Sequence, residues 1–232
     1  MPEPQAIAII PARGGSKRLP RKNVLPFNGR PIIEYTIDSA LDSDCFERVV
    51  VSSEDDEILE VASGAGAEVD RRPDELGGDS ATVVEVCVDL LQRESALGRR
   101  YERLAVLYAT APMRIADDIR STMALLDDSC CDFALAATPY PHYAHQALSL
   151  AEDQSVEPLW PESYEEHPDE IGKVVAGNGS TYCAKVEPFL DRLGFVGPAT
   201  RAHVMPIARS IDIDTDEEFR LAELMQKINH SR

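Results

Sequence analysis

The sequence has few positive charges, few cysteines and no long apolar run, and each shortage excludes a class of protein. Its 232 residues contain 23 lysines and arginines against 41 aspartates and glutamates, a formal net charge of −18. General nucleic-acid binding is not expected, because that affinity comes mainly from cations that neutralise phosphates. No stretch of about 18 consecutive apolar residues occurs and the opening MPEPQ is not basic, so we expect neither a membrane span nor a secretory signal. Five cysteines without a CxxC pair favour free thiols in a reducing cytoplasm.

Short β-branched runs alternate with amphipathic segments along most of the chain, which is typical of a layered α/β fold. Strands are expected at 6–10, 48–53, 103–110, 132–138 and 181–185. A helix should begin near Pro31, because apolar residues recur every four positions after it. Two further helices are predicted after Thr82 and Thr215, since each precedes a glutamate by three residues, the spacing of a capping box.

The stretch 139–178 interrupts this alternation. It contains five prolines and the single tryptophan of the chain. The composition predicts an inserted arm or small subdomain, with a solvated flexible loop as the alternative. Residues 1–138 and 179–232 are then expected to form the main domain.

Residues 11–23 (PARGGSKRLPRKN) form a basic loop with five cationic side chains and no acidic one. The loop follows the first expected strand, so its N–H groups and cations should lie at the carboxyl edge of a parallel sheet, where α/β folds bind ligands. It matches neither GxxxxGK(S/T) nor GxGxxG, which excludes the two commonest phosphate loops. Gly14 and Gly15 free the backbone to approach an anion, and Arg13 and Lys22 offer charge-assisted bonds to it. The alternative is a solvated loop, but the glycines and the acidic background favour an anion site.

A second polar motif, SIDIDT, lies at 210–215 near the other end of the chain. Strand geometry would turn Asp212 and Asp214 to one face and both isoleucines to the core. Two carboxylates on one edge suit a hard divalent cation, which in nucleotidyl transfer is also bound by substrate phosphates. The alternative is an acidic segment at the start of a helix. We favour the metal site, because the chain also contains a basic loop suited to the substrate phosphates.

The basic loop resembles the amino-terminal signature of the CMP-N-acylneuraminate synthetases, the cytidylyltransferases that activate sialic acid and its relatives. The resemblance spans nearly the whole chain outside 139–176, through GRPI (29–32), VVSSEDD (50–56), GAEV (66–69), RPDEL (72–76), TAPMR (110–114), DDI (117–119), NGSTY (178–182) and IDIDT (211–215). It implies a Rossmann-like three-layer fold of the nucleotide-diphospho-sugar transferase type. The arm at 139–178 would then serve dimerisation, and 1–138 with 179–232 would form the nucleotide-binding catalytic domain.

The same resemblance implies a reaction. The anomeric hydroxyl of a nine-carbon 2-keto acid sugar would attack the α-phosphorus of CTP, giving a CMP-sugar and pyrophosphate, with Mg²⁺ as cofactor and a homodimer as the assembly. The implied site residues are Arg13 and Lys22 for catalysis; these two with Gly14, Gly15, Ser16, Asn23, Arg72 and Thr82 for the nucleotide; Tyr108, Thr110, Lys173, Asn178 and Tyr182 for the sugar; and Asp212 and Asp214 for the metal.

Three of these positions have ordinary structural alternatives. Arg72 could form a surface ion pair with Asp74 or Glu75. Thr82 could be only a helix cap, and Asn178 could belong to a plain Asn-Gly turn, which is the strongest short turn signal.

The sugar and the reaction class each have alternatives. Tyr108 replaces a glutamine of sialate-specific members, and its YATAP motif resembles the pseudaminic acid branch, whereas NGSTY at 178–182 differs from that branch. Pseudaminic, legionaminic and neuraminic acids therefore all stay possible. CMP-Kdo synthetases resemble the chain less closely, because their loop lacks the double glycine and Asn23. A non-catalytic nucleotide-binding scaffold is the third alternative, which the intact charged residues argue against.

Overall fold

The computed structural model describes residues 5–78, 80–140 and 144–230. Within them, seven strands form one sheet in the order β11-β7-β10-β6-β1-β4-β5. These strands are β1 (Ala6–Pro11), β4 (Arg48–Ser53), β5 (Glu68–Arg71), β6 (Arg103–Leu107), β7 (Phe133–Pro139), β10 (Val175–Lys185) and β11 (Thr200–Val204). Only β10 runs antiparallel to its neighbours in this sheet. The carboxyl ends of β1, β4 and β6 therefore meet at one edge.

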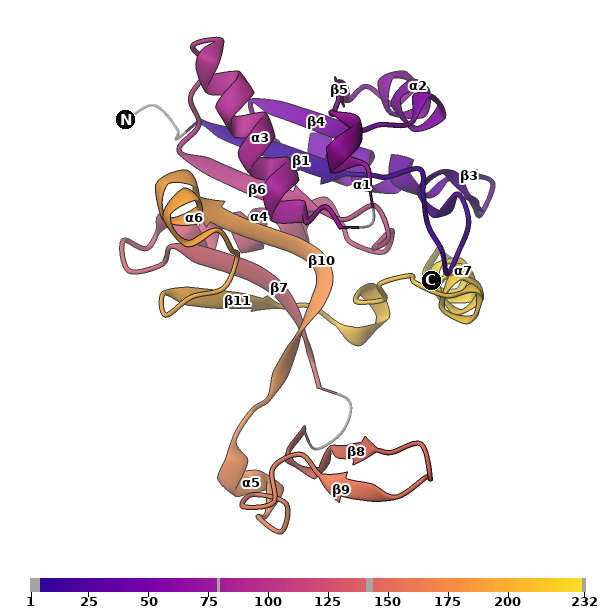
Figure 1. The fold of residues 1–232 in the computed structure, drawn as a ribbon, viewed down its shortest axis with the longest axis vertical. Coiled ribbons are helices and arrows are strands. Elements are labelled where there is room, and N and C mark those ends of the chain that lie inside the picture. The colour runs from indigo at the N-terminus through magenta and orange to yellow at the C-terminus, as the bar shows by residue number, and fades with distance from the viewer. Residues whose placement is uncertain (1–4, 79, 141–143, 231–232) are drawn as a thin grey trace.

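Helices cover both faces of the sheet (Figure 1). They are α1 (Ile32–Leu41), α2 (Asp56–Gly64), α3 (Val83–Ala96), α4 (Ala116–Ala124) and α6 (Val186–Arg192). Alternate residues of β1 divide the core: Ala8 and Ile10 belong to the cluster with α1, α2 and α4, whereas Ile7 and Ile9 belong to the cluster with α3 and α6. This period of two follows from strand geometry. The expected three-layer α/β fold is confirmed.

The last helix, α7 (Asp216–His230), packs near the amino-terminal part of the chain. Phe219 on α7 meets Phe27 edge to face, with ring centroids 5.6 Å apart. Phe27 lies in the small hairpin of β2 (Pro26–Phe27) and β3 (Arg30–Pro31), directly after the basic loop. Figure 1 shows β3 and α7 near one another at this end of the molecule. This packing brings 210–215 next to the basic loop.

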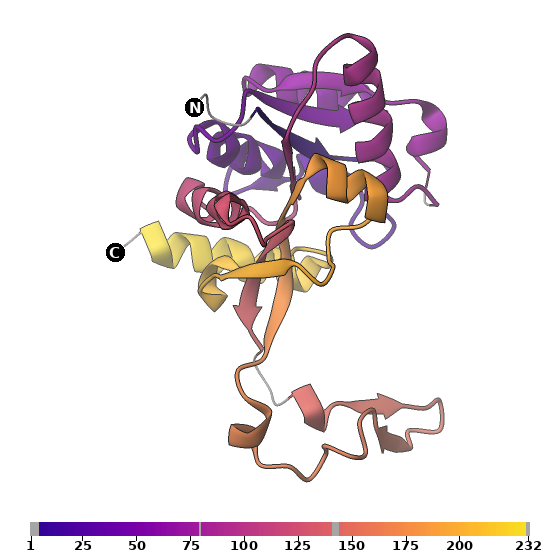
Figure 2. The same cartoon turned by 90° about the vertical axis from the view of Figure 1, so that its left-hand side faces the viewer.

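Residues 144–174 project away from the sheet as an arm, seen in both views (Figures 1 and 2). The arm contains β8 (Leu148–Leu150), β9 (Val156–Pro158) and α5 (Pro168–Ile171). It leaves the sheet after β7 and returns through β10, whose residues from Val175 already pair with β7. The arm of the structure is therefore shorter at its carboxyl end than the expected 139–178, and 141–143 lie outside the described residues.

Short 3₁₀ helices complete the described chain: η1 (Lys22–Val24), η2 (Asp74–Leu76), η3 (Leu125–Asp127), η4 (Ala144–Gln146) and η5 (Ile207–Arg209). None of the helices in the described residues is long and apolar enough to cross a bilayer.

Candidate active site

A cleft of ≈ 610 Å³ opens at the carboxyl edge of the sheet. The basic loop, the segment from Arg72 to the start of α3, the residues after β6 and the segment before α7 line it. Its polar lining residues include Arg13, Ser16, Lys17, Arg18, Lys22, Asn23, Arg72, Thr82, Tyr108, Thr110, Asp212 and Asp214. All of these except Lys17 and Arg18 are site residues that the sequence predicts. Segments from four parts of the chain thus converge on one cavity.

The two ends of the chain meet in this cleft through an ion-pair cluster. The Nζ of Lys22 lies 2.8 Å from Oδ1 of Asp214, and Nη2 of Arg18 lies 2.7 Å from Oδ2 of the same carboxylate. The Asp214 N–H donates to Glu218 at 2.9 Å, as does the N–H of Thr215, so the first turn of α7 fixes this segment. Thr215 and Glu218 form the expected reciprocal bonds of a capping box.

Asp212 is held from two sides. The hydroxyl of Thr110 donates to Oδ1 of Asp212 at 2.6 Å, and the N–H of Ile213 donates to the Thr110 carbonyl at 2.9 Å. On the other side, a Cβ on Gly179 would lie 2.2 Å from Oδ2 of Asp212, and Gly179 has a φ of +68°. Only glycine combines that backbone conformation with so close an approach.

The segment 210–215 is not a strand, so this part of the expectation is wrong. The alternation of its faces nevertheless holds, because Ile213 is buried while Asp212 and Asp214 line the cleft. Bonds from Thr110 and Glu218 replace the ladder of a strand as the constraint on this backbone.

The two carboxyl groups differ in pKa. Burial, together with the neighbouring negative charge of Asp214, raises the pKa of Asp212 above its usual range, although the bond from Thr110 opposes the shift. Burial also acts to raise the pKa of Asp214, but Lys22 and Arg18 outweigh it and hold that pKa below its usual range. One carboxylate is thus neutralised by cations of the protein, and the other lies in a site that favours an added positive charge.

The start of the basic loop is fixed by bonds to Asn23 and Glu54. The Asn23 amide donates to the Arg13 carbonyl at 2.9 Å, and the Gly14 N–H donates to Oε1 of Glu54 at 2.7 Å. Arg72, only 5% exposed, donates through Nε to Oε2 of Glu54 at 3.1 Å. Glu54, and not either neighbouring acid considered above, is therefore the ion-pair partner of Arg72.

Gly14 and Thr82 each have a structural role that the sequence indicates only in part. A Cβ on Gly14 would lie 2.5 Å from Oδ2 of Asp55, so the close approach requires glycine. At Gly15 a Cβ would meet no heavy atom within 4 Å, and neither glycine is among the residues that line the cleft. The Thr82 hydroxyl accepts from the Glu85 N–H at 3.2 Å as the cap of α3, while Thr82 also borders the cleft. The helix-cap interpretation of Thr82 is thus confirmed, and its contact with the nucleotide stays a prediction.

The residues predicted for the sugar divide into two groups. Tyr108 and Thr110 line the cleft, and the ring of Tyr182 packs edge to face behind that of Tyr108, with centroids 5.9 Å apart. Burial and the adjacent Tyr182 raise the pKa of Tyr108, so its phenol stays neutral at physiological pH. Asn178 is buried inside β10, and Lys173 is exposed on the arm; neither lines the cleft in this chain.

Two participants in the site carry only weak sequence signals. Glu54 directly follows β4 and so belongs to the same carboxyl edge as the basic loop, a position that a search for strand ends would find. Gly179 is the second residue of an Asn-Gly pair, which predicts a left-handed conformation but not its contact with Asp212.

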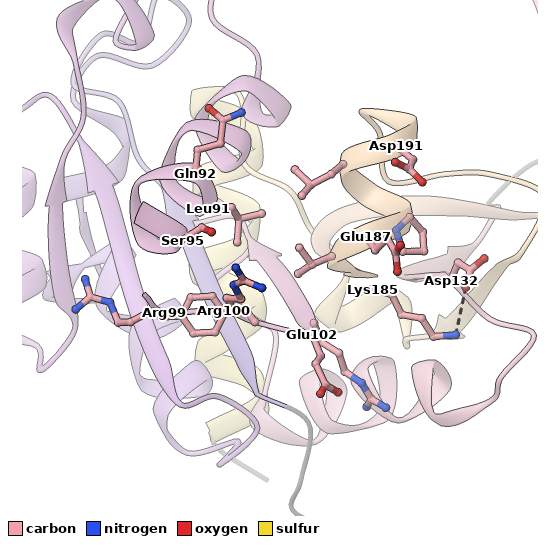
Figure 3. A pocket seen from close by; sticks show the side chains of 15 residues that line it. Leu91, Gln92, Ser95, Arg99, Arg100, Glu102, Asp132, Lys185, Glu187 and Asp191 are labelled. Atoms are coloured by element: carbon pink, nitrogen blue, oxygen red, sulfur yellow. Dashed lines mark hydrogen bonds and ion pairs between the residues drawn. The ribbon is translucent and has the colours of Figure 1, made fainter. Parts of the chain in front are cut away.

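A larger cleft of ≈ 890 Å³ lies at the opposite edge of the sheet, between α3 and α6 (Figure 3). No residue predicted for the site lines it. Its cations largely face acids of the protein: Lys185 lies 3.2 Å from Asp132, as Figure 3 marks, and Arg103 lies 2.7 Å from Asp127. The convergence of the predicted basic loop and aspartate pair, and not the volume, thus identifies the carboxyl-edge cleft as the candidate site.

Comparisons with known proteins identify the family. The cytidylyltransferase family model matches residues 7–131. The chain belongs to the cytidylyltransferase family. It is similar to a pseudaminic acid cytidylyltransferase of Campylobacter jejuni, with 32% identity over 97% of both chains. It is also similar to a CMP-N,N'-diacetyllegionaminic acid synthase of Legionella pneumophila, with 30% identity over 96% of this chain and 97% of the relative.

A solved structure supports the same fold. A CMP:2-keto-3-deoxy-manno-octonic acid synthetase, complexed with CTP, aligns with a TM-score of 0.72 over 98% of this chain and all of the other. Its sequence identity is 17%, so it shows the fold alone. The protein is thus a nucleotidyltransferase with the fold and family that the resemblance implies.

Proposed function

We propose that this cytidylyltransferase transfers CMP from CTP to the anomeric hydroxyl of a nine-carbon 2-keto acid sugar. A bond forms between the sugar oxygen and the α-phosphorus, the bond from that phosphorus to the bridging β-phosphate oxygen breaks, and pyrophosphate leaves. The single observation that carries the proposal is the meeting of Lys22 and Arg18 with Asp214 in one cleft. Two relatives named for nonulosonic acids, each similar over nearly its whole length, supply the sugar class.

The basic loop supplies the groups that hold the triphosphate. Lys22 is mostly buried and faces the cleft, where its ammonium would bond phosphate oxygens and stabilise the pyrophosphate as it leaves. Arg13 and Ser16 line the same wall, and Asn23 fixes the Arg13 carbonyl from behind. Arg72 and Thr82 border the side of the cleft toward α3, where we place nucleotide contacts. Catalysis of this type depends mainly on positioning and charge neutralisation.

The carboxylates of Asp212 and Asp214 fit the Mg²⁺ that the family implies. Both line the cleft beside the cationic loop, and burial together with the negative charge of Asp214 raises the pKa of Asp212. No group of three acidic, histidine or cysteine ligands occurs among the described residues, which suits an ion completed by substrate phosphates and water. When bound, Mg²⁺ would neutralise charge on the α- and β-phosphates.

Tyr108 is the residue we assign to the choice of sugar. It lies on the cleft wall as a neutral phenol, backed by Tyr182. A rigid aromatic wall of this kind discriminates between acceptors by shape, and the pseudaminic acid relative makes that sugar the first candidate. Legionaminic and neuraminic acids follow, and Kdo is the alternative from another sugar class.

We further propose a homodimer that forms through the arm. The arm exposes large apolar side chains, among them Leu150, Trp160 and Val156, which are 72%, 46% and 52% exposed. Such a set of apolar residues on a projecting segment suits burial against a second copy of the chain. In a dimer, Lys173 of the arm would be able to reach the sugar site of the partner chain. The free thiols and a CTP substrate fit a cytoplasmic location.

Pyrophosphate release tests the proposal. The protein is incubated with CTP, Mg²⁺ and, in separate reactions, pseudaminic, legionaminic, N-acetylneuraminic acid or Kdo. We expect release with at least one nine-carbon acid. Release with Kdo alone would reject the sugar class, and CTP binding without release in any reaction would favour the scaffold alternative.

A further inference from the structure

Arg114 is a deeply buried charge that the proposed chemistry does not use. Its side chain is 2% exposed, and Nη1 donates to the Ser180 carbonyl at 2.5 Å. Nε and Nη2 have no hydrogen-bond partner in the described part of the chain. Burial lowers the pKa of Arg114 to about 10, so the group is still a cation at neutral pH. A buried cation with one bond is costly, and an apolar residue of similar volume would pack at lower cost.

The bonded carbonyl belongs to residues 178–180 of β10, where the backbone turns at Gly179 (φ +68°) beside Asp212. Ser180 also accepts from the Tyr108 N–H at 3.1 Å, so the same oxygen joins the end of β6 to β10. Pairing of β10 with β7 shifts register between Gly177 and Tyr182, so on the β7 side the sheet ladder does not fix this turn. On that side, bonds from side chains hold it.

Asn178 supplies the second constraint on this turn. Its Oδ1 accepts from the N–H of Ser180 at 3.1 Å and from the hydroxyl of Ser180 at 2.8 Å. Its Nδ2 donates to the hydroxyl of Ser210 at 3.1 Å, which links the turn to the first residue of the segment 210–215. The turn formed by residues 178–180 is thus held by Arg114 from one side and by Asn178 from within.

This turn also limits where the Asp212 carboxylate can lie. Gly179 is its central residue, and its backbone stands so close to Oδ2 of Asp212 that a Cβ would overlap it at 2.2 Å. Thr110 holds the other oxygen, Oδ1, at 2.6 Å. The carboxylate therefore lies between the Thr110 hydroxyl and the Gly179 backbone, and any shift of the turn changes its orientation.

We propose that Arg114 is a positioning residue for metal binding, which acts through the Ser180 carbonyl and Gly179 to orient Asp212. The inference rests on the proposed metal role of Asp212. The backbone of Arg114 is itself anchored, because the Ser39 hydroxyl on α1 donates to the Arg114 carbonyl at 2.9 Å. Outer groups that orient a metal ligand typically contribute about 10- to 100-fold in affinity.

The test measures Mn²⁺ binding to the free protein by the loss of the EPR signal of the aqueous ion. Arg114→Met removes the bond to Ser180, and we expect its Mn²⁺ affinity to fall about 10- to 100-fold. Arg114→Lys keeps one donor, and because only Nη1 is bonded we expect it to lose less than about tenfold. The matched control is Arg103→Met, which removes a largely buried arginine from an ion pair at the opposite edge of the sheet and should bind Mn²⁺ as the wild type does.

A second variant keeps the inference testable if the first does not fold. If Arg114→Met does not fold, Asn178→Ala loosens the same turn without removing the buried cation, and the same loss of affinity is expected. Enzyme assays add a readout that a purely structural role would not move: raising the Mn²⁺ concentration should restore kcat in these variants, whereas a reduced fraction of folded protein would lower kcat at every concentration.

The outcomes separate this inference from the proposed function. If wild-type protein shows no Mn²⁺ binding that Asp212→Asn removes, the metal role of Asp212 fails and the inference fails with it. If Asp212→Asn loses binding while folded Arg114→Met, or Asn178→Ala in its place, binds Mn²⁺ as the wild type does, only the positioning role of Arg114 is overturned.

Discussion

Replacing Lys22 by methionine should reduce activity far more than stability. Its Nζ lies 2.8 Å from Asp214, with the two side chains 14% and 34% exposed, so the pair contributes about 0–1 kcal/mol to folding. For a chain of this size that corresponds to a Tm change of at most about 4 °C. In the reaction, the variant would lose a bond to a phosphate oxygen, which is about 1.5–3 kcal/mol, or about 10- to 150-fold in kcat/KM for CTP.

The assay pairs initial rates of pyrophosphate release with thermal unfolding of the same samples. Lys185→Met is the matched control, because Lys185 forms a similar partly exposed ion pair with Asp132, 3.2 Å apart, at the opposite edge of the sheet. It should keep wild-type kcat/KM. Wild-type kcat/KM in Lys22→Met, or a loss that unfolding fully explains, would refute the role of Lys22 in holding the triphosphate.

Four further changes probe other parts of the account. Asp214→Ala should abolish metal-dependent turnover with little change in Tm, and a loss of folding instead would show that this acid is structural. Tyr108→Gln should alter the ratio of kcat/KM between nonulosonic acids by about 10-fold or more while leaving the KM for CTP unchanged; an unaltered ratio would remove Tyr108 from sugar selection. Burial acts to raise the pKa of Asp118, but bonds from Arg209 and the Ile115 N–H outweigh it and lower that pKa. The stability from this shift is present at neutral pH and is lost as the pH falls through the lowered value, so Asp118→Asn should cost about 1–3 kcal/mol at pH 7 and the difference in Tm should narrow in acid. A difference that does not narrow would contradict the assignment. Trp160→Arg on the arm should convert a dimer into a monomer by light scattering, and an unchanged mass would argue against the arm as the interface.

The sequence was sufficient to predict the buried strands but not the edges of the sheet. β1, β4, β6 and β7 are apolar runs because both of their faces meet helices, and such runs stand out in the sequence. The strands β5 and β11 were not predicted. They are the two edges of the sheet, and the segments EVDR and TRAHV expose most of their side chains, so neither carries a hydrophobic pattern.

In the candidate site, too, some features could be predicted from the sequence and others could not. The basic loop and the aspartate pair were predictable because each is a local pattern of charge and glycine in a defined position relative to a strand or helix. Two features of the site depend on contacts between residues 40 or more positions apart. Glu54 accepts a hydrogen bond from the Gly14 N–H, and Arg114 supports the turn beside Asp212. A single sequence carries no periodic or spacing signal for such contacts, because each partner alone is an ordinary polar residue.

The most direct measurement of the central claim is the position of Mn²⁺ in crystals grown with CTP. Anomalous scattering locates the ion independently of the protein chain. The account predicts a peak at coordination distance from the carboxylates of Asp212 and Asp214 and from the phosphates, with Lys22 on the triphosphate. A triphosphate bound in the cleft between α3 and α6, or an ion that touches neither aspartate, would contradict it.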